Sequence, residues 1–305
     1  MAIVGPTAVG KSDVALDVAA RLGAEVLNAD AFQLYRGMDI GTAKMPEQAR
    51  RGIAHHLIDV LDVTDELSVA AFQQRGRAVL ADLAGRGVPA VVVGGSGLYV
   101  RALLDDLRFP GSDPDVRALW EARLAEQGPQ TLHAVLAERD PQAAAHILAS
   151  NGRRIVRALE VGEITGAPFV AQFPVTGPPL IDHDSFGLTL PREVLDLRIA
   201  ARVEHMFDSG LVDEVRALLD LGLREAPTAA RALGYPQVMD LLAGRLEDAQ
   251  ARAAIVTATR RYARRQERWF RRDPRITWLD ASGPPSSTAS LIADRVTAGA
   301  RTLGP

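Results

Sequence analysis

GPTAVGKS, residues 5–12, matches the phosphate-binding pattern GxxxxGK(S/T) at every fixed position. The motif follows the apolar run Ala2-Ile3-Val4 and precedes apolar spacing that predicts a helix ending at Gly23. A glycine loop in this context turns backbone N–H groups around an anion, and the positive end of the helix adds to the attraction. In this pattern the lysine neutralises phosphate oxygens and the serine hydroxyl ligates Mg²⁺. We therefore predict a diphosphate-binding loop made of Gly5, Pro6, Thr7, Ala8, Val9, Gly10, Lys11 and Ser12, with Ser12 as the metal ligand.

Lysine is rare in this chain, because Lys11 and Lys44 are the two lysines among 35 basic residues. Arginine takes almost every other position at which a cation would serve. A compact ammonium and a planar guanidinium are not interchangeable. The placement of one of the two lysines in the loop therefore supports phosphate binding.

Apolar runs outside the loop predict further strands of the same sheet. These strands lie at 25–28, 90–93, 186–190 and 277–279. Helical spacing predicts helices at about 68–87, 192–204, 211–221 and 248–272, with one peripheral helix in the tail after 280. Strands that alternate with helices and are apolar on both faces are typical of a parallel sheet covered on each side. The predicted fold class is therefore α/β, a P-loop NTPase-like parallel sheet flanked by helices.

The pattern changes at Pro110. Residues 110–167 have helical spacing broken by proline and glycine, and they contain no convincing strand. We predict a helical insertion domain at 112–167. The core would consist of residues 1–111 and 168–305, and its C-terminal part would be rich in helices.

The composition is that of an ordinary globular protein. The chain has 305 residues, a net charge of −3 and a pI near 6.1, so contact with nucleic acid requires a local basic patch. The absence of cysteine excludes disulfides, zinc ribbons and thiol nucleophiles, and no histidines have metal-binding spacing. The sequence predicts neither a signal peptide nor a membrane span, so the cytoplasm is the expected location.

A carboxylate, Asp30, follows the strand predicted at 25–28. In a parallel α/β sheet the carboxyl ends of the strands line the crevice where ligands bind, so Asp30 and the phosphate-binding loop should share one edge. Asp30 could act as a general base or hold a metal through water. It could equally cap a turn. Its position alone does not decide between these roles.

A phosphate-binding loop specifies a diphosphate and leaves the reaction open. A kinase or NTPase also needs an acidic residue after a hydrophobic strand to hold Mg²⁺. The strand at 90–93 instead runs into Gly94-Gly95-Ser96-Gly97, and Asp59 after Leu57-Ile58 is a weak substitute. A small-molecule or nucleoside kinase therefore stays open, and so does a non-catalytic RNA-binding module.

Several blocks together resemble the tRNA dimethylallyltransferase (tRNA isopentenyltransferase) family. The longest block runs from Asp30 to Lys44 and contains GMDIGTAK at 37–44. Further blocks are residues 5–12, 55–59, 94–99, 153–160, 233–235 and 262–266. The resemblance extends from about Ile3 to Arg272.

The resemblance implies transfer of a dimethylallyl group from dimethylallyl diphosphate to N6 of the adenosine at position 37 of tRNA, 3′ of the anticodon. Lys11, Mg²⁺ on Ser12 and Arg202, which matches a family arginine, would hold the diphosphate. Asp30 would accept the proton of the adenine amine. Ser96 stands where the family usually has threonine and would keep a polar contact near the reacting base. The implied catalytic residues are Asp30, Ser12, Arg202 and Ser96.

The resemblance also implies contacts with tRNA. The target base and its neighbours would meet Asp30, Ala31, Phe32, Gln33 and Ser96, although Ala31 replaces the serine usual in the family. In the insertion, which in the family closes over the anticodon arm, the implied contacts are Arg117, Arg153, Arg154, Ile155, Val156 and Arg157. Arginines between 260 and 272, interleaved with Tyr262, Trp269 and Phe270, would form a stripe for RNA phosphates. The implied partners are dimethylallyl diphosphate and the tRNA anticodon stem-loop, without a membrane or an obligate protein partner, and we expect a monomer.

Overall fold

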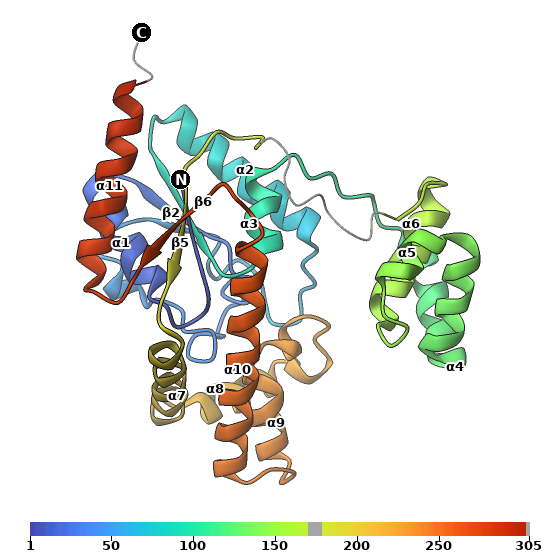
Figure 1. The fold of residues 1–305 in the computed structure, drawn as a ribbon. Helices are drawn as coiled ribbons and strands as arrows, with labels where there is room; N and C mark the ends of the chain where they lie inside the picture. The colour runs from blue at the N-terminus through green and yellow to red at the C-terminus, as the bar shows by residue number, and fades with distance from the viewer. Residues whose placement is uncertain (170–178, 303–305) are drawn as a thin grey trace. The chain divides into compact units, whose positions relative to one another are not determined.

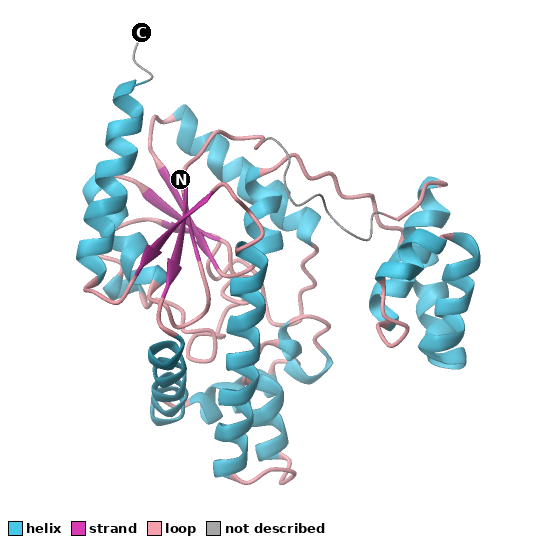
Figure 2. Ribbon diagram, in the orientation of Figure 1, coloured by secondary structure: helices cyan, strands magenta, loops and turns pink. Residues whose placement is uncertain are grey.

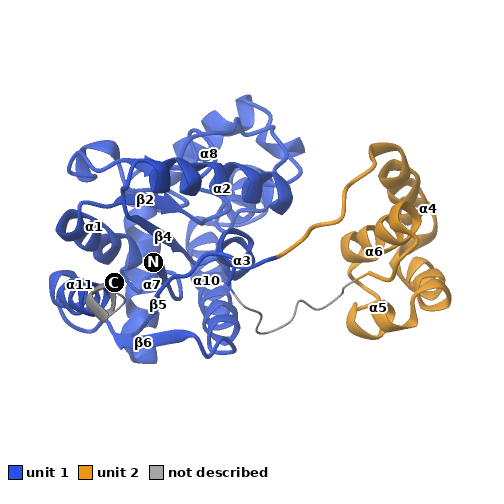
Figure 3. Ribbon diagram, turned by 90° about the horizontal axis from the view of Figure 1, so that it is seen from above, with its two compact units in different colours: residues 1–106, 178–305 blue, residues 107–177 orange. Residues whose placement is uncertain are grey.

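The computed structural model describes residues 1–169 and 179–302. The chain forms two compact units, Met1–Asp106 with Pro178–Pro305 and Leu107–Gly177 (Figure 3). The first unit contains the sheet and the phosphate-binding loop, and the described part of the second is helical. The insertion predicted at 112–167 lies inside the second unit, which extends beyond it at both ends.

Within the described residues, six parallel strands form a sheet in the order β3-β2-β4-β1-β5-β6 (Figures 1 and 2). The strands are β1 Ala2–Val4, β2 Glu25–Asn28, β3 His55–His56, β4 Ala90–Gly94, β5 Ser185–Thr189 and β6 Ile276–Asp280. The parallel pairing confirms the predicted α/β class. β3 was not predicted, because its two half-buried histidines carry no apolar pattern.

Helices cover both faces of this sheet. The helices of this unit are α1 Lys11–Leu22, α2 Val69–Gly85, α3 Gly97–Leu104, α7 Arg192–Asp208, α8 Leu211–Asp220, α9 Tyr235–Leu242, α10 Asp248–Phe270 and α11 Pro285–Thr302, with 3₁₀ turns at Glu47–Ala49, Leu223–Glu225 and Ala229–Arg231. Of these, α7, α8 and α9 lie beyond the ends of the strands (Figure 1). Successive strand residues point to opposite faces. Ile3 of β1 therefore packs in the core that includes α1 and α11, which lie side by side in Figure 1. Ala2 and Val4 pack in the core that includes α2 and α3.

Local signals explain the helix ends that were predicted. α1 ends at Gly23, which adopts a left-handed conformation with φ of 61°. α2 begins after Ser68, whose hydroxyl accepts from the Ala71 N–H at 3.1 Å. α3 and α9 were not predicted, because each has only 8 residues, which gives about two turns for a repeating pattern.

The second unit is built from three helices in its described residues, 107–169. They are α4 Pro114–Arg139, α5 Pro141–His146 and α6 Gly152–Thr165. α4 is kinked at Gly128, which has φ of 79°. Trp120, Leu132 and Ile155 belong to a hydrophobic core that lies within this second unit. In the described part of the whole chain, no helix combines the length and hydropathy needed to cross a membrane.

Candidate active site

The phosphate-binding loop lies at the carboxyl end of β1 and leads directly into α1. Two of its glycines are required by geometry, since Gly10 has φ of 99° and a Cβ on Gly5 would lie 2.7 Å from the Leu188 carbonyl oxygen. The Lys11 ammonium donates to the carbonyl oxygens of Gly5 at 3.0 Å and Pro6 at 2.8 Å. The lysine is therefore held within the loop, as a phosphate-binding lysine requires.

The charge of Lys11 is sensitive to its surroundings. Burial lowers the pKa of Lys11 to about 7, because the loop removes water from the ammonium. The Asp30 carboxylate opposes this shift and the Arg202 guanidinium adds to it. Near neutral pH, Lys11 is thus close to its midpoint of protonation. A bound polyanion would favour the charged form, so diphosphate binding should draw a proton onto Lys11.

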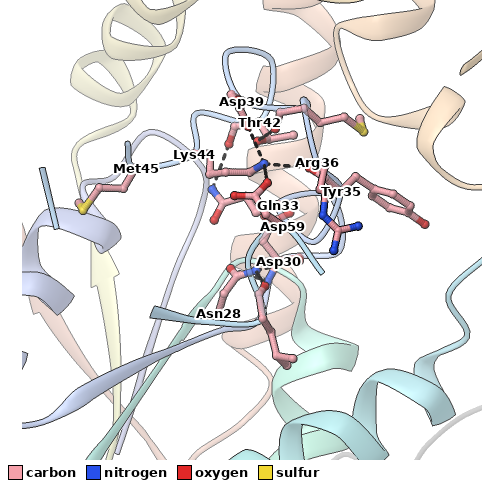
Figure 4. Close-up of polar contacts among 12 residues, drawn as sticks. Asn28, Asp30, Gln33, Tyr35, Arg36, Asp39, Thr42, Lys44, Met45 and Asp59 are labelled. Carbon is pink, nitrogen blue, oxygen red and sulfur yellow. Dashed lines mark hydrogen bonds and ion pairs between the residues drawn. The ribbon is translucent and has the colours of Figure 1, made fainter. Parts of the chain in front are cut away.

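Asp30 lies in a turn after β2 that the buried side chain of Asn28 organises (Figure 4). Asp30 N–H donates to Asn28 Oδ1 at 3.1 Å, and Asn28 Nδ2 donates to Leu57 O at 2.9 Å. Phe32 N–H donates to Asp30 Oδ1 at 2.9 Å. Burial raises the pKa of Asp30, and the Phe32 N–H and Lys11 offset this only in part. The carboxylate thus caps its turn and is also more basic than usual, so both proposed roles are compatible.

A cavity of about 560 Å³ opens over the phosphate-binding loop, and a second of about 340 Å³ shares part of its wall. Asp30 and Arg202 line both cavities, and Lys11 and Ser12 line the larger. The structure therefore brings these four predicted site residues together. Arg198, one turn before Arg202 on α7, donates to the Val9 carbonyl at 3.5 Å and so contacts the loop backbone.

The other residues predicted at this site lie in or next to these cavities. Of the loop, Thr7, Ala8 and Gly10 line the larger cavity, whereas Gly5, Pro6 and Val9 are buried behind it. Gln33 lines the larger cavity and Phe32 the smaller, while Ala31 lines neither within the described chain. Ser96 precedes α3 and hydrogen-bonds with Tyr262, whose pKa burial raises to about 12.

The residues around Ser12 fit a magnesium ion by their chemistry. The Ser12 side chain is exposed and lines the larger cavity together with the carboxylate of Asp13. Mg²⁺ prefers oxygen ligands and usually keeps several waters and substrate phosphates in its shell. A hydroxyl and a carboxylate next to a diphosphate-binding loop provide such oxygens.

The second lysine, Lys44, is buried and bonded entirely to groups of the protein. Its ammonium donates to Tyr35 O at 2.8 Å, Asp39 Oδ1 at 2.6 Å and Asp59 Oδ1 at 2.5 Å (Figure 4). Asp59, the weak magnesium ligand considered for a kinase, is therefore paired with this lysine. Lys44 thus ties the loop after β2 to the segment after β3.

Glu214 of α8 fixes the same loop from another side. Its carboxylate accepts from the backbone N–H groups of Asp39 at 2.9 Å, Ile40 at 2.6 Å and Gly41 at 3.1 Å. It also accepts from the Tyr235 hydroxyl at 2.7 Å. Sequence reasoning missed this contact, because no local pattern reports a bond between segments about 175 positions apart.

Replacing Lys44 with methionine is expected to lower the free energy of unfolding by about 2 kcal/mol. The change leaves Asp39 and Asp59 without their shared cation, although both remain partly hydrated because their side chains are 58% and 40% exposed. Urea unfolding measures the loss. Arg36→Met, which breaks an exposed pair with Asp62, should cost no more than about 0.5 kcal/mol. Equal losses in the two variants would contradict the assigned role of Lys44.

The arginine-rich helix α10 has two different faces. The exposed arginines along it and at its end are Arg261, Arg264, Arg265, Arg268, Arg271 and Arg272, and Arg265 also lines the smaller cavity. Arg260 is half-buried, and its guanidinium lies 3.8 Å from the Asp196 carboxylate. The predicted aromatic interleaving is incomplete, because Phe270 is buried in the core and Tyr262 lines the smaller cavity. Sequence reasoning noticed Gln266 only as part of a family block, yet its side chain points inward and bonds two loops of the site.

The residues predicted to contact tRNA in the insertion fall into three groups. Arg153 and Arg154 of α6 are exposed. Arg117 and Arg157 donate to the fully buried carboxylate of Glu160 at 3.0 and 2.9 Å, and these bonds hold its pKa below the ordinary value although burial acts to raise it. Ile155 and Val156 are buried in the core of the unit, so their side chains pack inside it.

Comparison with known proteins gives a consistent result. The sequence model of the IPP transferase family matches residues 33–273. A tRNA dimethylallyltransferase from Kineococcus radiotolerans is 57% identical over 302 residues, which cover 97% of this chain and 94% of that protein. One from Thermobifida fusca is 58% identical over 291 residues, covering 93% and 90%.

Among solved structures, the chain is similar to the full-length tRNA isopentenylpyrophosphate transferase from Bacillus halodurans. The two share 38% sequence identity and superpose with a TM-score of 0.71. The match covers 97% of this chain and 95% of that structure. The matched residues therefore include both the unit that contains the sheet and the unit of inserted helices.

Proposed function

The chain belongs to the IPP transferase family, and from this membership we propose that it is a tRNA dimethylallyltransferase. It transfers a dimethylallyl group from dimethylallyl diphosphate to N6 of the adenosine at position 37 of tRNA and releases diphosphate. The observation that carries this function is one cavity lined by both Lys11 and Asp30. A cation for a leaving diphosphate and a base for an attacking amine therefore face the same space.

The reaction exchanges one bond for another at C1 of the dimethylallyl group. The bond from C1 to the diphosphate oxygen breaks, and a bond from C1 to adenine N6 forms. The departing diphosphate gains negative charge, which the Lys11 ammonium and the Arg202 guanidinium neutralise. The allylic group spreads its positive charge over the double bond, so stabilising the leaving group is the main electrostatic task.

Asp30 accepts the proton that the N6 amine releases. An exocyclic adenine amine is a poor nucleophile until that proton is removed. The raised pKa of Asp30 makes its carboxylate a better acceptor, and the Asn28 and Phe32 bonds orient it. Ser96, near the smaller cavity through Tyr262, supplies a further polar contact for the base.

We also propose that Mg²⁺ binds beside Ser12 when the diphosphate is present. The Ser12 hydroxyl and diphosphate oxygens would hold the ion, with Asp13 close to its shell. A magnesium ion held there would supply additional neutralisation of the charge on the leaving diphosphate. Lys11 and Arg202 perform the same task from the protein side.

The proposed tRNA contacts divide between the two units. Around the cavities, Ala31, Phe32 and Gln33 meet the target base and its neighbours. Taking the adenosine out of its stack lets N6 reach the donor. In the insertion, exposed Arg153 and Arg154 are the proposed phosphate contacts. The other four proposed insertion contacts shape the surface that meets the tRNA. Ile155 and Val156 do so by packing in the core of the unit, and Arg117 and Arg157 do so by pairing with Glu160.

The affinity of the free enzyme for dimethylallyl diphosphate is expected to fall as the pH rises above about 7. Lys11 must be protonated to pair with the diphosphate, and its pKa in the free enzyme is about 7. Below this pH the charge is already present, so affinity changes little through Lys11. Above it, the affinity should fall by about tenfold per pH unit until the higher pKa of the complex is reached.

Titration calorimetry between about pH 6 and 9 measures this dependence, with Lys11→Arg as the matched control. Arginine stays charged throughout this range, so the variant should lose the fall above pH 7 even where its absolute affinity is lower. The ionisation of free dimethylallyl diphosphate is the same in the titrations of wild type and of Lys11→Arg, so it does not contribute to a difference between them. The same pH dependence in wild type and variant would show that Lys11 is not its source.

Two reactions distinguish the proposed transfer from a kinase activity. In one the protein is incubated with tRNA and dimethylallyl diphosphate, and in the other it is incubated with ATP. We expect diphosphate release that requires tRNA, without turnover of ATP. Pairing of Asp59 with Lys44 leaves this carboxylate engaged within the protein, which disfavours the kinase. Turnover of ATP without tRNA-dependent diphosphate release would contradict the proposal.

We propose that the protein acts in the cytoplasm and as a monomer. Its tRNA substrate and its cysteine-free sequence both suit a reducing compartment. One chain supplies both Lys11 and Asp30 to the larger cavity, so the reaction needs no second copy.

A further inference from the structure

Gln266 is a buried amide whose two ends bond to two different loops of the site. It lies on the inner face of α10 and is 5% exposed. Its Oε1 accepts from the Thr7 N–H at 2.8 Å, and its Nε2 donates to the Gly95 carbonyl at 3.0 Å. Within the described residues, Gln266 lines neither of the two cavities. Its contacts are therefore with the walls of the site.

The two loops that Gln266 joins serve different substrates in the proposed reaction. Thr7 belongs to the phosphate-binding loop, which holds the donor. Gly95 immediately precedes Ser96, the proposed contact for the acceptor base. A displacement at C1 needs the N6 nucleophile and the leaving oxygen to lie in line on opposite sides of that carbon. The separation of the two loops therefore sets how well the substrates are aligned.

The contact is built closely around this amide. A Cβ on Gly95 would lie 2.2 Å from Gln266 Nε2, so the amide would have to leave its present position if any other residue replaced Gly95. Tyr262, one turn earlier on α10, hydrogen-bonds with Ser96 and with Gln266. One face of α10 thus bonds Gly95 and Ser96 of the loop after β4, and the same face bonds Thr7 of the phosphate-binding loop.

We propose that Gln266 is a positioning residue that fixes the phosphate-binding loop relative to the Gly95–Ser96 loop and so aligns donor with acceptor. This role rests on the proposed transfer of a dimethylallyl group to tRNA. It predicts that loss of the amide slows the chemical step, while each substrate still binds to its own loop. A purely structural residue would instead change the fraction of folded enzyme.

Single-turnover transfer, with enzyme in excess over tRNA and saturating dimethylallyl diphosphate, separates these effects. The rate constant reports alignment in each active molecule, and the amplitude reports how many molecules are active. The test variant is Gln266→Leu, which removes the bonds to Thr7, Gly95 and Tyr262. A second variant, Gln266→Glu, keeps an acceptor for Thr7 but places a carboxylate oxygen against the Gly95 carbonyl. The control is Gln250→Leu, which removes an exposed amide that accepts from Glu247 N–H on the same helix.

We expect the rate constant to fall by about 100-fold in Gln266→Leu and by at least about tenfold in Gln266→Glu. The dissociation constants for dimethylallyl diphosphate and tRNA should stay within about threefold of wild type, and Gln250→Leu should match wild type. Rate constants within about threefold of wild type in both Gln266 variants would overturn the proposal. The proposal would also be overturned if the Gln266 variants lowered only the amplitude or only the affinity for a substrate and left the rate constant unchanged. Failure of the proposed function is distinct, because wild type and the Gln250 control would then be inactive as well.

Discussion

Asp30→Asn is expected to transfer the dimethylallyl group about 10³-fold more slowly than wild type while binding tRNA almost normally. Asparagine keeps an oxygen that can accept from the Phe32 N–H, so the turn after β2 should persist. It cannot accept the proton that leaves N6, because an amide is not a base near neutral pH. The loss therefore falls on the chemical step. Single-turnover transfer and a filter-binding titration with tRNA measure the two quantities.

Asp62→Asn provides the matched control for this change. Asp62 is an exposed carboxylate paired with Arg36, so its neutralisation removes the same charge away from the cavities. The control should keep the wild-type rate. If Asp30→Asn kept more than about a tenth of that rate, the assignment of the base would be wrong. If it instead lost tRNA binding and kept the wild-type single-turnover rate constant at saturating tRNA, Asp30 would act as an RNA contact alone.

Lys11→Met should also reduce transfer by about 10³-fold, mainly because the departing diphosphate loses its cation. Methionine preserves the length and the apolar stem of the side chain but removes the ammonium. The bonds to the Gly5 and Pro6 carbonyls disappear with it, so the loop should also bind dimethylallyl diphosphate more weakly. Steady-state kinetics with varied dimethylallyl diphosphate resolve the fall in kcat from the rise in KM.

Arg21→Met controls for the loss of a positive charge from α1. Arg21 is an exposed cation in the last turn of the helix, at the end opposite the phosphate-binding loop. Its replacement should leave both kinetic constants unchanged. If Lys11→Met transferred the dimethylallyl group at the wild-type rate, the role of the phosphate-binding loop in the reaction would be contradicted.

The core of the site could be predicted from sequence because its signals are local. The GxxxxGK(S/T) loop carries its own strand and helix context, and the structure has β1 and α1 on either side of it. Asp30 was placed near Lys11 by a general property of parallel sheets, whose strands end at a common edge. Both residues line the larger cavity.

The supports of the site could not be predicted, because their partners are far apart in the chain. Glu214 reaches the backbone around Ile40, 174 positions away, and Gln266 reaches Thr7, 259 positions away. Gln266 does stand on the buried stripe of α10, between Ala263 and Phe270, so the helical spacing could have shown that it faces inward. The spacing could not identify the two loops that it bonds. The rarity of lysine singles out Lys44 in the sequence, but only the structure shows that its ammonium bonds Tyr35, Asp39 and Asp59 inside the protein.

The arginines illustrate the same limit. Sequence alone treats Arg117 and Arg157 like Arg153 and Arg154, since all four lie in helical segments of the insertion. The buried Glu160 carboxylate separates them, because it takes the first two into ion pairs within the unit. The sequence does not show that Glu160 is buried between Arg117 and Arg157, because this pairing forms only when α4 packs against α6.

The most direct test of the central claim is mass spectrometry of the nucleosides of tRNA after reaction with dimethylallyl diphosphate. We predict an adenosine that carries one additional five-carbon unit on N6, located next to the anticodon when the tRNA is cleaved into oligonucleotides. The product should form with wild type and be nearly absent with Asp30→Asn. Unmodified adenosine with wild-type enzyme and both substrates present, or the five-carbon unit on another nucleoside, would contradict the account.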